Sequence, residues 1–183
     1  MNLRSDEAHK QDQDRDGKEE VFFRICNSVL KKEVEKGHLQ WTISDVARDA
    51  EVTRSLVYYY FGKEKEKVFT EAWKYMISLF FQFSDVGKST PINERMYGIL
   101  QSMRRMPYLF ILFFLQKSRD TEIAKEISKA EEQLLDIFQQ EYPSYSRTQI
   151  LRLYLMELGA IAYNLKPEDA LEVFDFPREA EPK

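Results

Sequence analysis

The sequence has very few of the side chains that form disulfides or bind transition metals. Its 183 residues include one cysteine, Cys26, and two histidines, His9 and His38. A single cysteine cannot build a disulfide framework, which is typical of a protein in a reducing compartment such as the cytoplasm. No Cys/His cluster has metal spacing, and no Ser, His and acid arrangement of a hydrolase is discernible. We therefore expect no metal site, no cofactor and no enzyme.

A long apolar run is also missing. The longest one, from Tyr108 to Leu115, is much shorter than the roughly 20 residues that span a bilayer, so no membrane partner is expected. The first 17 residues have no apolar core, so we expect no signal peptide there. Hydrophobic residues make up 43% of the chain, which is enough for a folded core. The net charge of -4 excludes a protein that coats nucleic acid by bulk charge, but it does not exclude a local basic face.

The N-terminal 17 residues contain a possible but incomplete calcium motif. Residues 1–17 are polar, with three basic and five acidic side chains, and we expect a disordered tail. Within them Asp12, Asp14 and Asp16 match the first half of an EF-hand loop. Such a loop needs a bidentate glutamate at its twelfth position, which here is Phe23. A solvated acidic tail is therefore the better interpretation.

From Lys18 onward the apolar residues recur at helical spacing, which predicts an all-α fold. The first helix carries an apolar stripe and ends at the stop signal Gly37. The residues of the stripe are Phe22, Cys26, Val29, Leu30 and Val34. Because Cys26 lies on this stripe, we interpret it as a core residue rather than a redox centre.

Two short helices joined by a tight turn are predicted over residues 42–61. Thr42 with Asp45 resembles a capping box that begins the first helix, and Thr53 is the candidate N-cap of the second. The aromatic run at the end of this segment has the composition of a strand. The two caps are too close for independent elements, however, and the rings do not alternate with polar residues. With the longer helix before them, the two short helices form a helix-turn-helix unit.

On the second short helix, two faces are predicted. Val57 and Phe61 are four positions apart and fall on the inner face, with Tyr60 beside them. The outer face carries groups that can reach phosphate oxygens or base edges of DNA. These residues are Arg54, Ser55, Tyr58 and Tyr59. Between residues 52 and 63 the only charged side chains are those of Arg54 and Lys63, so this surface is locally basic.

This segment resembles the DNA-binding region of the TetR family of bacterial transcriptional repressors. The resemblance covers residues 18–75 and rests on caps, apolar positions and aromatic residues that agree in spacing. The matching residues are Thr42, Asp45, Val46, Ala47, Ala50, Val52, Thr53, Val57, Tyr58, Tyr60, Phe61 and Lys65. The resemblance implies a one-component transcriptional regulator, a repressor, that binds a near-palindromic double-stranded DNA operator as a homodimer in the cytoplasm.

Two features depart from the family pattern. Glu51 stands where the family usually has a turn glycine, and a glutamate at positive φ costs about 1 kcal/mol. Its charge near DNA keeps an alternative open, a helical dimeric adaptor that kept the fold but lost DNA binding or ligand response. The segment after Phe61 is also longer than usual, which makes Lys63 and Lys65 rival phosphate contacts. Lys65 is favoured because Val68 then takes the usual apolar position.

By the resemblance, the chain divides into a DNA-binding domain over residues 18–65, an effector-binding and dimerisation domain over 66–176, and a C-terminal tail over 177–183. The expected DNA contacts are Thr42, Thr53, Arg54, Ser55, Tyr58, Tyr59, Lys63 and Lys65.

The second domain is predicted to be helical throughout. Pro107 begins a segment that is apolar almost all round, so a buried central helix is expected. Ser146 and Gln149 form a capping box for the last long helix, which has apolar residues on both faces. A chain of this size cannot bury both faces by itself, so one face needs a partner. The resemblance implies a dimer interface formed by the last two long helices, with the contacts Ile127, Leu134, Leu151, Leu155, Leu158 and Ile161.

The resemblance further implies an effector pocket in the second domain. Its abundant aromatic and methionine side chains favour an apolar or aromatic small molecule, although a plain core is the competing interpretation. The expected lining residues are Trp73, Met96, Tyr97, Met103, Tyr108, Phe110, Phe113 and Phe114. An anionic effector would need a buried base, and the nearest candidates, Arg104, Arg105 and Lys117, are predicted on helix surfaces.

Overall fold

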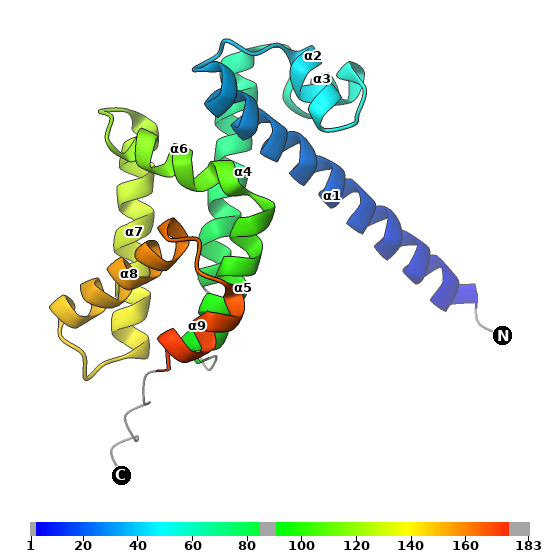
Figure 1. Cartoon of the computed structure of the whole chain (residues 1–183). Coiled ribbons are helices and arrows are strands. Elements are labelled where there is room, and N and C mark those ends of the chain that lie inside the picture. Colours follow the sequence, from blue (N-terminus) through cyan, green and yellow to red (C-terminus); the bar gives the residue numbers. More distant parts are fainter. Residues whose placement is uncertain (1–2, 85–90, 176–183) are drawn as a thin grey trace. The chain divides into compact units, whose positions relative to one another are not determined.

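The structure, a computed structural model, describes residues 3–84 and 91–175, and their side chains over 17–81 and 91–175. Within these ranges the chain forms nine α-helices and no strand, which confirms the predicted all-α fold (Figure 1). The chain divides into two compact units, Met1–Ile77 and Ser78–Lys183. The division therefore falls further along the chain than the expected boundary after residue 65. The expected tail over 177–183 lies outside the described residues.

The first unit contains α1 (Leu3–Lys36), α2 (Ile43–Asp49), α3 (Arg54–Phe61) and the first part of α4 (Lys65–Ser84). Since α1 begins at Leu3, the residues expected to form a disordered tail are helical from that point. Their many Glu, Gln, Lys, Arg and Ala residues are good helix formers, which the polar composition alone did not reveal. The aspartates of the calcium-like motif lie within this helix, and a calcium ion needs a loop instead.

The core of the first unit is made of apolar residues from all four helices. Members without solvent exposure are Ile25, Cys26, Val29 and Leu30 of α1, Trp41, Val46, Val57, and Val68, Ala72, Trp73 and Met76 of α4. Burial raises the pKa of the Cys26 thiol far above its usual value, so the residue is an inert part of the core, as expected. The ring of Phe22 stacks on Phe61 with a centroid distance of 5.1 Å and meets Tyr60 and Tyr75 edge-on. These contacts hold α3 by its inner face.

The three predicted helix caps are present. Thr42 with Asp45 and Ser146 with Gln149 form complete capping boxes, and Thr53 caps α3. At α5, Pro91 occupies the N-cap, and no side chain caps this helix by a hydrogen bond within the described residues.

The second unit contains α5 (Ile92–Arg105), α6 (Pro107–Lys117), α7 (Glu122–Glu141), α8 (Arg147–Ala162) and the short α9 (Pro167–Val173). The sequence did not predict α9, which packs along α5. In the same unit α6 packs on α7, α7 on α8, and α5 contacts both α6 and α8 (Figure 1). The apolar residues of α5, α7 and α8 meet in this arrangement.

The expectation that α6 is buried all round is wrong. Leu109, Leu112 and Phe113 are buried, but Ile111, Phe114 and Leu115 on the other side are 45%, 45% and 46% exposed. Because α6 packs on α5 and α7 with only part of its circumference, the remaining apolar residues face outward.

Arg95 occupies the interior of the second unit. Its guanidinium donates to Glu141 and Glu157, each at 3.0 Å, and lies 4.4 Å from the centre of the Phe138 ring. The three charged residues come from α5, α7 and α8. Burial raises the pKa of Glu157 to about 7, although Arg95 acts in the opposite direction, and Glu141 adds to the rise. The network joins three helices through one buried cation.

A second polar cluster joins α6, α7 and α8. The buried carboxylate of Glu131 accepts hydrogen bonds from Lys117 and from the Tyr154 hydroxyl, the latter at 2.6 Å. Burial, and then the Glu131 carboxylate, raise the pKa of Tyr154 above its usual value, so the phenol remains a donor. Lys117, expected as a surface base, is therefore paired with an acid.

We expect Glu157→Gln to change how stability depends on pH. The pKa of Glu157 rises from 4.5 to about 7 on folding. Below pH 4.5 the carboxyl is therefore protonated in both states. As the pH rises to 7 the unfolded chain releases this proton first, which destabilises the folded state by up to about 3 kcal/mol. Thermal unfolding between pH 5 and 8 should therefore show the wild-type Tm falling relative to that of Glu157→Gln. A Tm difference that is constant with pH would contradict the assignment.

Candidate functional site

The outer face of α3 forms an exposed polar surface, as predicted. Arg54, Ser55, Tyr58 and Tyr59 are all exposed, with Tyr59 at 80% and Tyr58 at 38%. On the opposite side Val57 and Phe61 are buried, while Tyr60 is half-buried. The aromatic run is thus divided between the core and a surface that offers a guanidinium and three hydroxyl groups.

The two capping threonines differ in what their hydroxyl groups can still do. Thr53 Oγ1 accepts a hydrogen bond from the backbone N–H of Leu56 at 3.2 Å, which leaves its own hydrogen available. Thr42 Oγ1 accepts from the Asp45 N–H at 3.2 Å and also donates to Asp45 Oδ2 at 2.8 Å. In this arrangement Thr53 can donate to a phosphate, but Thr42 has no hydrogen left for one.

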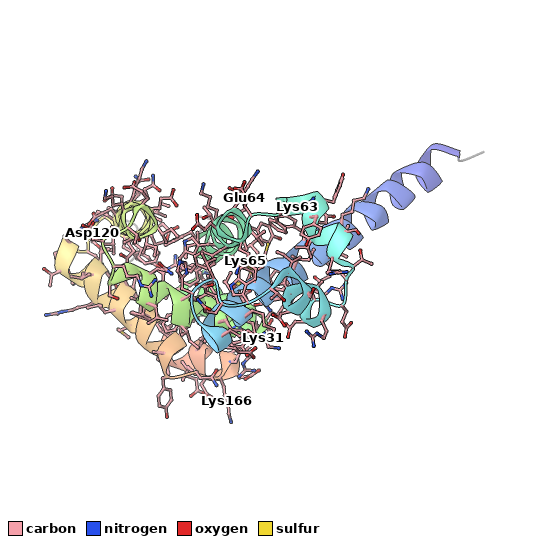
Figure 2. The ribbon with its side chains drawn as sticks, turned by 90° about the horizontal axis from the view of Figure 1, so that it is seen from above. Lys31, Lys63, Glu64, Lys65, Asp120 and Lys166 are labelled. Carbon is pink, nitrogen blue, oxygen red and sulfur yellow. The ribbon has the colours of Figure 1, made fainter. Side chains whose placement is uncertain are left out.

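The structure distinguishes Lys63 from Lys65. Lys65 Nζ donates to the carbonyl oxygens of Leu39 at 2.6 Å and Trp41 at 3.3 Å, so it fastens the segment between α1 and α2. Lys63 is exposed, and within the described residues its amine has no partner. Figure 2 labels Lys63 in the connection between α3 and α4, and Lys65 as the first residue of α4. Of these two lysines, Lys63 is therefore the one whose amine has no partner among the described residues, and the phosphate contact itself stays a prediction.

Glu33, a buried residue that the sequence interpretation missed, holds the same segment from the other side. Its carboxylate accepts from the Trp41 indole N–H at 2.7 Å, from the Leu39 backbone N–H at 3.1 Å and from His38 Nδ1. Leu39 has a positive φ of 54°. The sequence did contain a sign of this buried acid, because Glu33 comes four positions after the core residue Val29 and so lies on the face of α1 that packs in the core.

The acidic side chains of α2 are neutralised by cations. Asp45 pairs with Lys36 at 2.8 Å and with Arg48 at 3.1 Å, and the Lys36 ammonium holds the pKa of this carboxyl well below its usual range. Asp49 pairs with Lys31 at 2.7 Å and Lys32 at 3.0 Å. No uncompensated acid of α2 therefore opposes the positive charges of Arg54 and Lys63.

Glu51 has the strained conformation that the sequence predicts. Its φ is 56°, in the left-handed region that usually belongs to glycine, and it costs about 1 kcal/mol. The side chain is exposed, and its carboxylate lies 3.7 Å from Arg24 Nη1. An exposed pair of this kind contributes little to stability, but it reduces the negative charge beside α3.

The residues expected to line one effector pocket do not gather around one cavity. Trp73, Met96, Met103 and Phe113 are buried, Tyr97, Tyr108 and Phe110 are half-buried, and Phe114 is 45% exposed. Trp73 belongs to the first unit and the other residues to the second. Phe114 faces outward, so its assignment to an internal pocket is wrong.

Described residues of the second unit line the following two cavities, among others that such a surface has. One, of about 230 Å³, lies where α5 turns into α6 and is lined by Leu100, Met103, Arg104, Pro107, Phe110, Ile161 and Asn164. It includes Met103 and Phe110 of the expected set. The other, of about 210 Å³, lies between the start of α5, the α7–α8 connection and α8. It is lined by Ile92, Tyr142, Tyr145, Gln149, Arg152, Leu153 and Met156, none of which the sequence interpretation assigned to a pocket.

The expected dimer contacts are divided between the core and the surface. Ile127 and Leu134 of α7 are 1% and 3% exposed, so they pack inside the subunit and their assignment to an interface is wrong. Helix α7 turns its apolar stripe inward together with the paired acids Glu131 and Glu141, and its other charged residues lie at the surface. Leu158 is also buried, and Ile161 is partly buried. Leu151 and Leu155 of α8 are 44% and 55% exposed, so these two of the expected contacts lie at the surface of the subunit.

Neither a metal centre nor a membrane helix is found in the described ranges. No group of three or more His, Cys, Asp or Glu side chains there could hold a metal ion. No helix in these ranges combines the length and the hydropathy needed to cross a bilayer.

The chain has the fold of TetR-family transcriptional regulators. It is similar to the TetR family transcriptional regulator PfmR from Thermus thermophilus, with a TM-score of 0.56 and 17% sequence identity over 83% of this chain and 92% of that one. It is equally similar to a mutant of HlyIIR in which a segment is replaced by a glycine–serine linker, with a TM-score of 0.56 and 16% identity over 88% of this chain and 99% of that one. No protein-family model and no curated protein matches the sequence.

We expect Lys65→Met to lower the Tm by about 2–4 °C, because it removes the cation that holds the Leu39 and Trp41 carbonyl groups. Lys63→Met, the matched control in the same turn, should leave the Tm unchanged. Thermal unfolding followed by circular dichroism measures both. Equal Tm values for the two variants would show that Lys65 does not fasten this segment.

Proposed function

We propose that the protein is a one-component, DNA-binding transcriptional regulator that acts as a homodimer in the cytoplasm. The observation that carries the proposal is the exposed face of α3, with Arg54, Ser55, Tyr58 and Tyr59 on a helix whose other side is fixed in the core. The similarity of the fold to TetR-family regulators supports it.

In this proposal α3 enters the major groove of DNA as the reading helix. Arg54, in its first turn, donates two hydrogen bonds to a guanine edge. Tyr58, Tyr59 and Ser55 donate to phosphate oxygens or base edges, Thr53 donates to a phosphate at the helix start, and Lys63 neutralises one phosphate. The contacts to phosphate set the position of the protein, and Arg54 supplies the preference for sequence.

The homodimer forms through α8. Leu151 and Leu155 expose apolar side chains, and the small residues Gly159 and Ala162 on the same side allow a second helix to approach closely. A dimer with twofold symmetry carries two copies of α3, one for each half-site of a near-palindromic operator. Ile127 and Leu134 take no part, because they are buried in the subunit.

The regulator acts as a repressor by occupying its operator, and an apolar or aromatic small molecule bound in the second unit releases it. The support is the presence of two cavities with largely apolar walls in that unit. A ligand that fits one spacing of the two reading helices better than another shifts the population away from the DNA-binding form.

We expect Arg54→Ala and Lys63→Ala to weaken DNA binding in different ways. Selection of duplexes from a random pool gives the base preference, and gel shifts at several salt concentrations give the number of ions released. Arg54→Ala should relax the preference at one position in each half-site, by about 1–3 kcal/mol. Lys63→Ala should weaken all sequences alike and make the salt dependence shallower by about one ion.

Lys129→Ala, on the outer surface of α7, is the matched control and should change neither property. A wild-type protein that selects no duplex would instead favour the adaptor alternative, for which the charge of Glu51 beside α3 is the motivating feature.

We expect Leu155→Glu to separate the dimer, because a charge would be buried without a partner at the proposed interface, at a cost of several kcal/mol. Gln133→Glu, which adds the same charge to the exposed face of α7, should leave the dimer intact. Sedimentation velocity over a range of protein concentrations distinguishes the two. If Leu155→Glu remains a dimer with wild-type affinity, the interface lies on another surface, and the exposed residues of α6 are the next to test.

A further inference from the structure

The cavity between α5, the α7–α8 connection and α8 is lined by aliphatic side chains on one part and by aromatic side chains on another. Ile92, Leu153 and Met156 supply aliphatic surface from two helices. Tyr142 and Tyr145 supply two rings with their centroids 5.3 Å apart and their planes inclined by 35°. The volume, about 210 Å³, suits a molecule with one small ring rather than a large multi-ring compound. Flat rings pack favourably against such tyrosines.

One cation lines this cavity, and it has no acidic partner. Within the described residues the guanidinium of Arg152 makes no ion pair and no hydrogen bond. Arg147, earlier on the same helix, donates to Glu132 at 2.8 Å and to Asp136 at 3.0 Å. Arg147 is thus neutralised by acids of α7, whereas Arg152 is left for another anion.

The other polar side chains that line the cavity are neutral, so none of them is a negatively charged partner for Arg152. The side-chain oxygen of Gln149 already accepts from the backbone N–H of Ser146 at 2.8 Å and from its hydroxyl at 2.9 Å. Tyrosine hydroxyl groups carry no negative charge at neutral pH. The site therefore presents a positive charge at the edge of an apolar space, which is the complement of an amphipathic anion.

We propose that this cavity binds a small aromatic monocarboxylate, with the ring against Tyr142 and Tyr145 and the carboxylate paired with the guanidinium of Arg152. A planar guanidinium matches a carboxylate through two parallel hydrogen bonds. The further step, that such an acid is the effector that controls DNA binding, rests on the proposed function.

The buried charges beside the cavity are compatible with an anion. Arg95, one turn after Ile92, is shared by Glu141 and Glu157. Because burial raises the pKa of Glu157 to about 7, this cluster has little net negative charge near neutrality and does not repel a carboxylate. Arg95 also ties together α5, α7 and α8, the elements that border the cavity. A ligand that changes their spacing acts on the helix that carries Leu155 and the proposed dimer surface.

The test is isothermal titration of the full chain with 3-phenylpropionate and with its amide, which has the same shape and no charge. We expect the wild type to bind the acid at least tenfold more tightly than the amide. Arg152→Ala should remove this preference, while the matched control Arg147→Ala should keep it. Met156→Trp, which fills the cavity, should lose binding of both compounds. Circular dichroism confirms that each variant is folded.

Equal affinity for the acid and the amide, absence of acid binding to the wild type, or an acid affinity unchanged in both Arg152→Ala and Met156→Trp would overturn the proposal. The proposed function is tested separately by gel shifts of a selected duplex with and without the acid. If the acid binds through Arg152 but no duplex is bound, the site stands and the DNA-binding function fails. If the duplex is bound but the acid does not release it, the site stands and its role as the effector site fails.

Discussion

The position of the candidate reading helix depends on a buried carboxylate. A charge inside the first unit costs free energy unless it is fully hydrogen-bonded. Glu33 meets this condition by accepting from the Trp41 indole, the Leu39 backbone and His38, all in the segment between α1 and α2. Lys65 holds two carbonyl groups of that segment from α4. The segment leads directly into α2, and α3 follows after one turn, so these contacts set where Arg54 and Tyr59 are presented.

In the second unit, the packing around α8 gives this helix three sides with different surroundings. Its inner side packs in the core through Leu153, Tyr154 and Glu157, and Arg95 ties the last of these to α5. A second side exposes Leu155 and its neighbours, and a third lines the cavity at Arg152. Because one rigid helix carries all three, a change at one side reaches the others without any need for an extended pathway. This is the physical basis for connecting the proposed ligand site with the proposed dimer surface.

Much of the first unit follows from local rules. The capping box of α2, the N-cap of α3 and the division of α3 into a buried and an exposed face were predicted, because each depends on residues within a few positions of one another. The positive φ of Glu51 followed from the resemblance, since the family usually has a glycine at this turn position. The assignments that failed depend on distant neighbours. The apolar stripe of α7 with Ile127 and Leu134 has the same spacing whether it meets its own subunit or a partner, and only the packing on α6 and α8 decides between them.

The sequence by itself determined the all-α fold, the helix starts and the polar face of α3, since periodicity and capping act over one or two helical turns. The tertiary structure decided which charged side chains bind partners within the protein and which are left to bind a ligand. Lys65 and Lys63 are two positions apart, yet one is bound to carbonyl groups of a distant segment and the other is available to meet a ligand. Arg95 and Arg152 differ in the same way, because the acids that surround Arg95 come from α7 and α8. Whether a charge has a partner is a property of three-dimensional proximity, which local spacing cannot specify.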